Sequence, residues 1–464
     1  MKSIRELIQI IKNRPADAPA VRYVGKEGVN CKTNSELIRD VYNAAECFNS
    51  YFGGEAKGKH VAFVSLTSYE LVVSVLVCGL LGAVSVLINP LEGEEKVKLL
   101  ASRADADLVV ANPSEFVPVK EKAEAEAIER VFSDYADDFS FLLFTSGTTG
   151  DMKGVMLSQR NFLSSATRIT NVFEGISRIR PDIAFASCYV MLPMYHAFGL
   201  AIAFTALSGG VTLDLCLDFR MFYRDLQMLN SEIVACPPMA IKMFAADILN
   251  KEVTKWGKGI KFIFSGAARI SPVDLTTIAQ NNILVAYGYG MTETAGSGTL
   301  NVFMTKFESA GRAADSTKIE IRDGEIFLKD DSVMLGYYKD PVNTSETLVD
   351  GFVATGDLGY TDEEGFLYIT GRKKNLIILS GGENVSPEEI ENRLMEYPEI
   401  REVLVKEKDQ NVFALIFCRP GDEETIKEKI KEYNKTVPSY KRVTKFEFVH
   451  EPLEKTGIGK IKRS

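Results

Sequence analysis

The chain has 464 residues, a formal net charge of −9 at pH 7 and 46% hydrophobic residues. A chain of this length is expected to form about two to four domains with buried apolar cores. Its ordinary apolar content and 25% charged residues exclude a wholly disordered protein. The acidic balance argues against a general nucleic-acid binder, because such proteins usually carry net positive charge.

The cysteines and histidines indicate neither a disulfide framework nor a zinc motif. The histidines, His60, His196 and His450, are far apart, so no cluster with the usual zinc-ligand spacing is visible. The cysteines form no CxxC pair, which predicts free, mostly buried thiols in a reducing compartment. Residues 1–15 lack the apolar core and cleavage site of a signal peptide, so we expect a cytoplasmic protein. The seven cysteines are Cys31, Cys47, Cys78, Cys188, Cys216, Cys236 and Cys418.

The first half of the chain alternates helical and strand-like patterns. Thr33 and Glu36 form a candidate capping box that opens a helix. The uncharged stretch Leu71–Leu91 is long enough for a membrane-spanning helix, but Gly79 and Gly82 interrupt it before a β-branched run. We therefore predict a helix, a break and a buried strand, with no membrane span. Strand-like runs occur at 61–66, 83–88, 107–111, 139–144, 261–265 and 283–287.

This alternation predicts an α/β protein with large, mainly parallel sheets. After about residue 371 the strands shorten and charged helices such as 423–434 dominate. Residues 375–464 carry 16 Lys and Arg against 17 Asp and Glu, so nearly all of the acidic excess precedes them. We predict a large N-terminal domain of layered α/β sheets at 1–371 and a small C-terminal α+β domain at 372–464.

A loop rich in glycine and threonine follows the predicted strand at 139–144. Glycines permit tight turns whose backbone N–H groups point inward, hydroxyls add donors, and Lys153 adds a positive charge. These features predict a polyphosphate cradle, although the GxxxxGK[ST] spacing of ordinary P-loops is absent. The alternative is a flexible surface turn. The loop consists of Thr145, Ser146, Gly147, Thr148, Thr149, Gly150, Asp151, Met152, Lys153 and Gly154.

This loop resembles the phosphate loop of the AMP-forming adenylating enzymes, a superfamily that includes acyl- and aryl-CoA synthetases. Met152 stands where the family usually has proline, and loss of the fixed φ is expected to loosen the loop while keeping its donors. Further segments resemble family motifs in the family's order, which extends the resemblance to residue 463. These segments are 192–199, 265–268, 287–293, 355–357, 371–374, 381–391 and 454–463.

The resemblance implies a role for individual residues in binding ATP and Mg²⁺. Tyr289 would stack on adenine, Thr292 would contact phosphate and Glu293 would bind Mg²⁺. Asp357 and Arg372 would hold the ribose. The implied nucleotide-binding set is Thr145, Ser146, Gly147, Thr148, Thr149, Gly150, Lys153, Gly266, Ala267, Ala268, Tyr287, Gly288, Tyr289, Thr292, Asp357, Arg372 and Lys460.

The same resemblance implies catalysis that depends on a mobile small domain. Lys374 would be its hinge, and Lys460 would bridge the carboxylate and the α-phosphate. For His196 the alternative is a structural residue of the core. Glu388 and Glu389 are more simply explained as helix-start residues, because Ser386 is a candidate N-cap and Glu389 would complete its capping box. The implied catalytic residues are Lys460, Thr292, Glu293 and His196, and the implied acid pocket is Tyr195, His196, Phe198, Gly199, Gly266 and Gly288.

The resemblance implies an AMP-forming acyl-CoA synthetase with the cofactors ATP, Mg²⁺ and CoA. It would activate a lipophilic carboxylic acid, either fatty or aryl, to an acyl-adenylate and transfer the acyl group to the thiol of CoA. An amino-acid substrate is disfavoured, because the FDxS-like segment that seats an α-amine is absent. A standalone enzyme that loads the phosphopantetheine of an acyl carrier protein is the alternative. A nucleotide-binding protein without catalysis is the third interpretation.

Basic residues in the C-terminal part fit each of these acceptors. They would meet the phosphates of CoA or an acidic carrier protein, or they would serve solubility alone. These residues are Lys441, Arg442, Lys455, Lys462 and Arg463.

Overall fold

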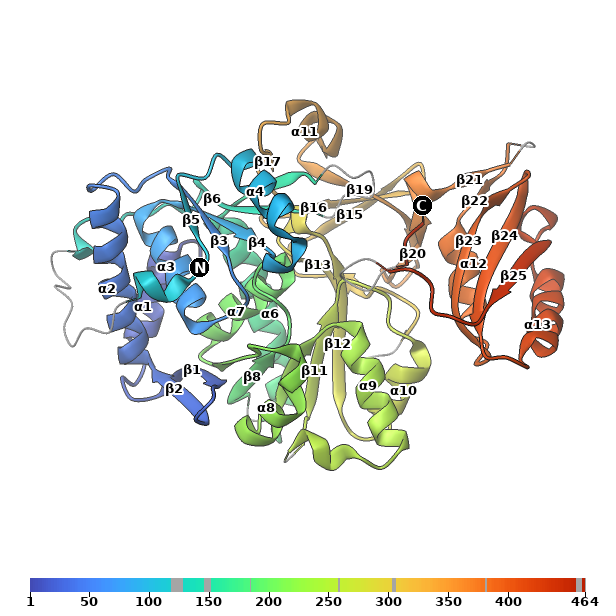
Figure 1. The fold of residues 1–464 in the computed structure, drawn as a ribbon, viewed down its shortest axis with the longest axis horizontal. Helices are drawn as coiled ribbons and strands as arrows, with labels where there is room; N and C mark the ends of the chain where they lie inside the picture. Colours follow the sequence, from blue (N-terminus) through green and yellow to red (C-terminus); the bar gives the residue numbers. More distant parts are fainter. Residues whose placement is uncertain are drawn as a thin grey trace. The chain divides into compact units, whose positions relative to one another are not determined.

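The computed structural model describes residues 1–117, 128–145, 152–183, 185–257, 259–302, 306–379, 382–455 and 461–463 (Figure 1). The chain divides into two compact units. The large unit contains Met1–Ile319, Phe327–Ala354 and Gly365–Leu367, and the small unit contains Glu320–Ile326, Thr355–Glu364 and Tyr368–Ser464. The predicted class, a large N-terminal α/β part with a small C-terminal part, is confirmed. The boundary at 371/372 stays a prediction.

The largest sheet of the large unit has nine strands in the order β14-β13-β12-β11-β10-β8-β9-β1-β2. Strands β1, β9, β8, β10, β11 and β12 pair in parallel, as the continuous apolar runs predict. Strands β2, β13 and β14 pair antiparallel at the two edges. The strands are β1 Pro19–Val24, β2 Val29–Thr33, β8 Ser187–Val190, β9 Thr212–Leu215, β10 Ile233–Cys236, β11 Phe262–Gly266, β12 Leu284–Gly290, β13 Gly298–Asn301 and β14 Arg312–Ala313.

A second sheet of the large unit has six strands in the order β17-β7-β6-β4-β3-β5. Strand β6 runs parallel to β4 and antiparallel to β7, so the predicted phosphate loop connects two antiparallel neighbours. Strand β17 pairs antiparallel with β7, which brings a distant segment to the same edge. The strands are β3 His60–Val64, β4 Val84–Ile88, β5 Leu108–Val110, β6 Phe139–Phe144, β7 Gly154–Ser158 and β17 Gly336–Tyr337.

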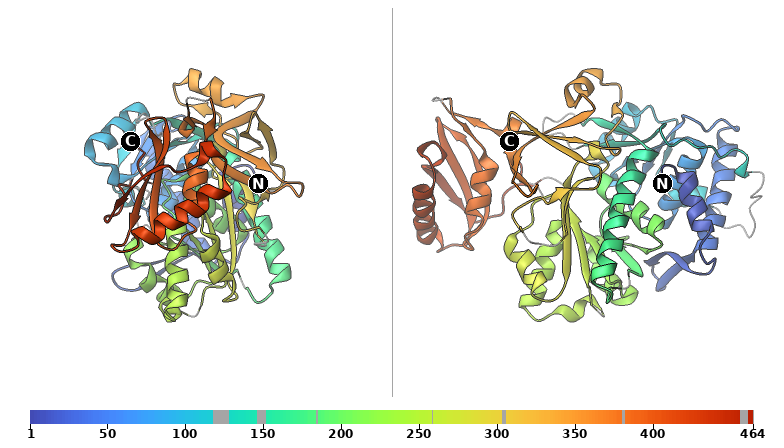
Figure 2. Two further views of the ribbon diagram at one scale, coloured as in Figure 1. Left: turned by 90° about the vertical axis from the view of Figure 1, so that its right-hand side faces the viewer. Right: turned by 180° about the vertical axis from the view of Figure 1, so that it is seen from behind.

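Helices cover these two sheets, and Figures 1 and 2 show α9 and α10 side by side next to β12. Helix α2 begins at the predicted capping box, where the Glu36 N–H donates to Thr33 Oγ1 at 3.2 Å and the Thr33 N–H donates to Glu36 at 2.9 Å. The described helices of the large unit are α1 Ile4–Lys12, α2 Asn34–Tyr51, α3 Tyr69–Leu81, α4 Glu94–Arg103, α6 Gln159–Ile179, α7 Ala197–Gly209, α8 Phe222–Leu229, α9 Pro238–Leu249, α10 Pro272–Ala279 and α11 Pro341–Thr347.

The uncharged stretch Leu71–Leu91 folds as the sequence predicts. Helix α3 ends at Gly82, and the fully buried strand β4 follows. Every residue from Leu71 to Leu81 is buried, so the stretch is apolar because it lies in the core of an α/β layer. Within the described part of the chain, no helix is both long and apolar enough to cross a membrane.

A further sheet has five strands in the order β15-β16-β19-β18, in which β20 also pairs with β19. Its strands are β15 Lys318–Arg322, β16 Glu325–Lys329, β18 Leu348–Val349, β19 Phe352–Thr361 and β20 Leu367–Arg372. The rest of the small unit holds the short pair β21 Ile377–Ile378 and β22 Asn384–Val385, helices α12 Pro387–Leu394 and α13 Glu423–Thr436, and the sheet β23 Ile400–Lys408, β24 Asn411–Cys418 and β25 Lys445–Val449.

Helix α13 packs its apolar side on that three-stranded sheet, as Figures 1 and 2 show. Ile426, Ile430 and Tyr433 of the helix are buried in a core that also contains Val412, Ala414 and Ile416 of β24. The spacing of the helical residues places them on one face, which explains why the charged 423–434 segment is a stable helix.

Candidate active site

The predicted phosphate loop is held at its base by the β6–β7 hairpin. The Thr145 N–H donates to the Lys153 carbonyl oxygen at 3.0 Å, and the loop residues Ser146, Gly147, Thr148, Thr149 and Gly150 lie outside the described residues. The Lys153 ammonium donates to Asn343 Oδ1 of α11 and lies 4.8 Å from the centre of the Tyr337 ring. The loop lysine is therefore positioned by two residues that lie about 190 positions further along the chain.

Glu293, the predicted Mg²⁺ ligand, lies in the 3-10 turn Thr292–Thr294 directly after β12. Its side chain is buried, and the Tyr337 hydroxyl donates to Oε1 at 2.7 Å. Its backbone oxygen accepts the Met334 N–H at 2.8 Å. Burial, followed by the nearby Glu293 carboxylate, raises the pKa of Tyr337, so its hydroxyl stays a donor at neutral pH. A carboxylate oriented in this way by a second residue is typical of a metal ligand.

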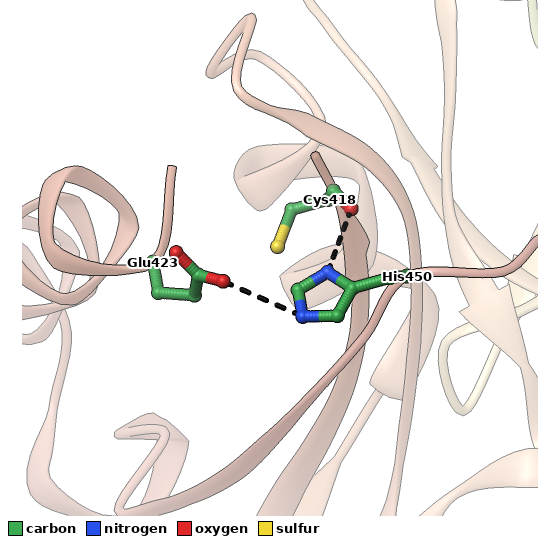
Figure 3. A group of neighbouring side chains, drawn as sticks. All are labelled: Cys418, Glu423 and His450. Atoms are coloured by element: carbon green, nitrogen blue, oxygen red, sulfur yellow. Dashed lines mark hydrogen bonds and ion pairs between the residues drawn. The ribbon is translucent and has the colours of Figure 1, made fainter. Parts of the chain in front are cut away.

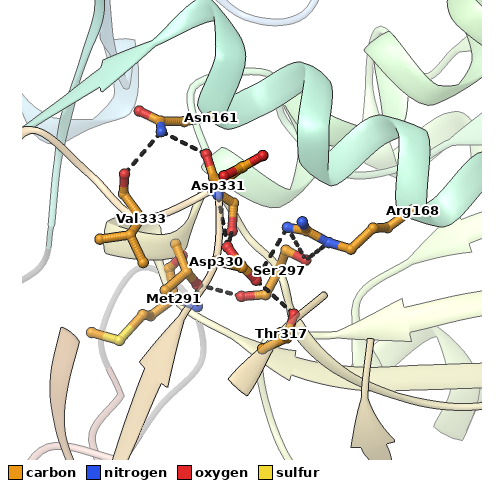
Figure 4. A network of polar contacts seen from close by, with 10 residues as sticks. Asn161, Arg168, Met291, Ser297, Thr317, Asp330, Asp331 and Val333 are labelled. Atoms are coloured by element: carbon orange, nitrogen blue, oxygen red, sulfur yellow. Dashed lines mark hydrogen bonds and ion pairs between the residues drawn. The ribbon is translucent and has the colours of Figure 1, made fainter. Parts of the chain in front are cut away.

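A buried polar network supports the segment that carries Glu293 (Figure 4). Arg168 of α6 donates to Ser297 Oγ at 3.0 and 3.2 Å, and its guanidinium lies 3.4 Å from Asp330 Oδ2. Asp330 also accepts the Thr317 hydroxyl at 2.6 Å. Burial lowers the pKa of Arg168 and the Asp330 carboxylate opposes that shift. Because both charges are buried, their pairing fixes the distance between α6 and the segment after Glu293.

The same region is fixed at two further points. The Met291 N–H donates to Thr294 Oγ1 at 3.2 Å, which closes the 3-10 turn on itself. The Asn161 amide donates to the carbonyl oxygens of Asp331 and Val333, both at 2.8 Å (Figure 4). Hydrogen bonds therefore fix both the turn that contains Glu293 and the neighbouring segment 331–333.

The residues of the predicted acid pocket lie around the start of α7. His196 is the N-cap residue and is exposed to solvent, so it is not a core histidine. Surrounding protein still desolvates its ring enough to lower the pKa, which keeps the imidazole neutral at pH 7. The Tyr195 ring contacts the His196 ring edge-on at 4.8 Å, and the Phe198 ring lies 5.5 Å from Phe264 of β11. The arrangement forms an aromatic wall with one polar ring.

Two glycines of this pocket, Gly199 and Gly288, lie where no larger residue would fit. A Cβ atom at Gly288 would lie 2.1 Å from the Thr299 carbonyl oxygen, and one at Gly199 would lie 2.2 Å from the Pro193 carbonyl oxygen. Glycine is therefore required by close backbone approach at both positions.

The turn that follows β11 contains a strained residue. Ala267 has φ +70°, a left-handed conformation that is unusual for alanine, and both Ala267 and Ala268 are exposed. Gly266 precedes them as the last residue of β11. Strain of this kind at an open turn beside the predicted pocket is typical of a functional site.

The two tyrosines of the 287–293 motif differ in their surroundings. Tyr287 is buried, and its hydroxyl donates to the Phe307 carbonyl oxygen at 3.2 Å and accepts the Asn301 amide at 2.9 Å. Tyr289 is only partly buried, and its N–H donates to Thr299 Oγ1 at 3.3 Å. Tyr287 thus serves the scaffold, whereas the ring of Tyr289 stays partly accessible for stacking.

In the small unit, the structure brings the two predicted ribose-binding residues together. Asp357 of β19 is buried, and its Oδ1 lies 2.6 Å from Nε of Arg372 at the end of β20. The predicted hinge residue Lys374 lies in the 3-10 turn Lys373–Asn375, where Lys373 pairs with Glu325 at 2.8 Å. Lys460 lies outside the described residues.

Most of the basic residues considered for acceptor binding have carboxylate partners within the small unit. Lys441 pairs with Glu389 at 2.8 Å, and that contact occupies the acid at the start of α12. Such pairing favours the interpretation of these cations as surface ion pairs. The remaining pairs are Lys455 with Glu402, Lys462 with Glu454, and Arg463 with Glu388 and Glu391.

Tyr337 and Asn343 are the residues that sequence reasoning missed. The Tyr337 hydroxyl donates to Glu293 across 44 positions of sequence. A tyrosine after glycine carries no sequence signal for this role. The contact depends on the pairing of β17 with β7, which the sequence did not predict.

Comparison with known proteins identifies the class. The AMP-binding enzyme family matches residues 9–338, and the AMP-binding enzyme C-terminal domain matches residues 389–460. The chain therefore belongs to the AMP-binding enzyme family, and the resemblance noted in its motifs is confirmed.

Several relatives are named for one reaction. The chain is 30% identical to 2-succinylbenzoate–CoA ligase of Bacillus mycoides, with 82% of this chain and 84% of that one covered. It is 28% identical to the Bacillus licheniformis enzyme of the same name, with 94% and 95% covered. Among solved structures, o-succinylbenzoate coenzyme A synthetase of Bacillus subtilis with ATP and magnesium ion gives a TM-score of 0.79 at 25% identity, with 98% of each chain covered. ATP-bound MatB of Rhodopseudomonas palustris gives a TM-score of 0.79 at 23% identity, with 98% and 97% covered, which shows the shared fold.

Proposed function

We propose that this protein is an AMP-forming acid–thiol ligase that activates an aromatic carboxylic acid with ATP and transfers the acyl group to CoA, with 2-succinylbenzoate as the first candidate acid. The main observation behind the proposal is that the Tyr337 hydroxyl orients the buried Glu293 carboxylate. Tyr337 lies in the edge strand β17, which pairs with β7, and its ring is 4.8 Å from the Lys153 ammonium. Family membership and the names of the relatives support the reaction class.

The described residues fit the chemistry of the first half-reaction. The acid's carboxylate attacks the α-phosphorus of ATP, so an acyl–O–P bond forms and the bond to pyrophosphate breaks. Bound Mg²⁺ would neutralise charge on the phosphates, and the hard oxygen donors of Glu293 suit it. Lys153 and the Thr145 end of the loop would hold the phosphates, and Lys460, which lies outside the described residues, would bridge the carboxylate and the α-phosphate as the family resemblance implies. Positioning and charge stabilisation supply most of the rate enhancement in such a step.

The acid is proposed to be aromatic rather than fatty. Tyr195 and Phe198 place aromatic rings around the start of α7, and the Phe198 ring packs on the buried Phe264. Flat rings pack favourably against such a wall in tilted and edge-on arrangements. Both ligases compared above act, by name, on 2-succinylbenzoate, and this supports an aryl acid over a fatty acid.

CoA is the proposed acceptor in the second half-reaction. The thiol attacks the acyl-adenylate carbonyl, the thioester forms, and AMP leaves with the electron pair of the broken acyl–O bond. An acyl carrier protein would need an accessible basic surface. The ion pairs of Lys441, Lys455, Lys462 and Arg463 occupy four of the five basic side chains that the sequence offered for that purpose.

A panel experiment tests the function. Pyrophosphate release and thioester formation are measured with 2-succinylbenzoate, benzoate, a medium-chain fatty acid and an amino acid, each with and without CoA. We expect acid-dependent pyrophosphate release and a CoA thioester with the aryl acids, and a loss of both in Glu293→Gln. Adenylation without a CoA thioester would favour a carrier protein. The absence of acid-dependent pyrophosphate release would indicate a nucleotide-binding protein without catalysis.

A further inference from the structure

A cysteine, a glutamate and a histidine from three elements meet in the small unit. Cys418 is the last residue of β24, Glu423 is the first residue of α13, and His450 directly follows β25. Strands β24 and β25 pair in parallel, so their carboxyl ends lie at one edge, where the connecting helix begins. Ligands of α/β folds commonly bind at such an edge. One donor atom from each residue lies within 4.8 Å of the other two.

Hydrogen bonds orient two of the three side chains. His450 Nδ1 lies 3.3 Å from the Cys418 carbonyl oxygen, so a proton on Nδ1 leaves the Nε2 lone pair facing Glu423 Oε1 at 3.4 Å. The Gly421 N–H donates to Glu423 Oε2 at 2.8 Å and turns the other oxygen toward the ring. Figure 3 shows the Cys418 sulfur pointing into the space between the imidazole and the carboxylate. A backbone carbonyl on the second nitrogen is the usual partner of a metal-binding histidine.

The environment of the cluster favours a cation. The nearby Glu423 and Asp422 carboxylates place negative charge close to the Cys418 sulfur. Acidic residues at 422–424 also offset the positive end of the α13 dipole. Cys418 is buried, whereas the His450 side chain is 46% exposed, so the donor atoms lie between the core and solvent. A metal ion thus has both an entry path and an open position for water.

We propose that Cys418, Glu423 and His450 form a zinc site, separate from the Mg²⁺ ligand Glu293, with a water molecule as the fourth ligand. Sulfur, imidazole nitrogen and carboxylate oxygen together suit a borderline ion such as Zn²⁺, whereas Mg²⁺ prefers oxygen alone. The bound ion would link β24, α13 and β25 and stabilise the small unit. Binding requires that the Cys418 thiol release its proton to solvent as the sulfur–zinc bond forms.

Cobalt serves as a probe of the site, because a thiolate ligand to Co²⁺ gives a sulfur-to-metal charge-transfer band. The full-length protein is stripped with a chelator and titrated with Co²⁺ in excess Mg²⁺. We expect one Co²⁺ per chain, a charge-transfer band, and displacement by an equivalent of Zn²⁺. Absence of stoichiometric binding, or binding without the band, would overturn the proposal.

Variants locate the site. His450→Ala should weaken Zn²⁺ binding by more than about 100-fold. Removing a residue that only hydrogen-bonds to a metal ligand already lowers metal affinity by about 10–100-fold, and this substitution removes the ligand itself. Glu423→Gln should also weaken it, whereas Glu424→Gln and Cys31→Ser are matched controls that should bind like wild type. Cys418→Ser should abolish the charge-transfer band, and a band that persists in the folded variant would refute the assignment. If Cys418→Ser does not fold, the assignment would be refuted by wild-type affinity for Zn²⁺ in both His450→Ala and Glu423→Gln.

Discussion

The two units hold their charged side chains in different ways. In the large unit, Arg168 and Asp330 are 6% and 2% exposed and pair behind the segment that carries Glu293. In the small unit, Lys441 and Glu389 are 22% and 45% exposed, and their pair lies at the surface. The buried pair orders the backbone around Glu293, whereas the exposed pair only joins neighbouring elements.

The difference predicts unequal consequences when a partner is removed. A buried charge that loses its partner cannot recover the missing interaction from water, so the free energy of unfolding falls by a large amount. An exposed charge is re-solvated and screened by salt, so the loss is small. Two substitutions, at Arg168 and Lys441, test this difference through the free energy of unfolding, and a third, at Tyr337, tests the hydrogen bond to Glu293 through the reaction rate.

The largest effect is expected for Arg168→Met. It leaves the buried Asp330 carboxylate without its cation and should lower the free energy of unfolding by about 3–5 kcal/mol. Urea unfolding followed by far-UV circular dichroism measures the change. The double variant Arg168→Met/Asp330→Asn is the control, because it removes both charges and should recover part of the loss. Equal stability of wild type and Arg168→Met would show that the buried pair does not order this region.

An intermediate effect is expected for Tyr337→Phe, which removes the hydroxyl that donates to Glu293 but keeps the ring beside Lys153. Pyrophosphate release should fall by about 10–100-fold, and the Mg²⁺ concentration needed for half-maximal rate should rise. Tyr338→Phe is the matched control, because its hydroxyl bonds to the exposed Asp105 instead, at 2.7 Å. An unchanged Mg²⁺ requirement in Tyr337→Phe would remove Tyr337 from the site.

The smallest effect is expected for Lys441→Gln, which breaks the exposed pair with Glu389. The free energy of unfolding should fall by less than about 1 kcal/mol, and the difference from wild type should shrink as salt is added. The KM for CoA, measured in parallel, should stay unchanged. A several-fold rise in that KM at unchanged stability would instead place Lys441 in acceptor binding.

Local sequence signals predicted the elements well. The capping box at Thr33, the strand at 139–144 and the interrupted run Leu71–Leu91 each appear as expected, because their signals lie within a few residues. The start of α12 was predicted in part. Ser386 accepts the Glu389 N–H at 3.4 Å, but the Glu389 side chain pairs with Lys441 rather than completing a capping box.

Contacts between distant segments could not be predicted. Tyr337 reaches Glu293 only because β17 joins the edge of β7, and strand order is set by tertiary packing. The three histidines gave no zinc motif because Cys418 and His450 come from different strands, and the third donor is a glutamate. Recognition of such a cluster needs the parallel pairing of β24 and β25.

Two of the three glycines of the predicted acid pocket, Gly199 and Gly288, restrict how its specificity can be redesigned. Any side chain at Gly199 or Gly288 would collide with a backbone carbonyl, so mutations there would disrupt the framework before they reshaped the cavity. The side chains of Tyr195 and Phe198 are only partly buried. A directed-evolution library that randomises 195 and 198 and keeps both glycines should therefore retain a larger share of folded variants for selection on new acids.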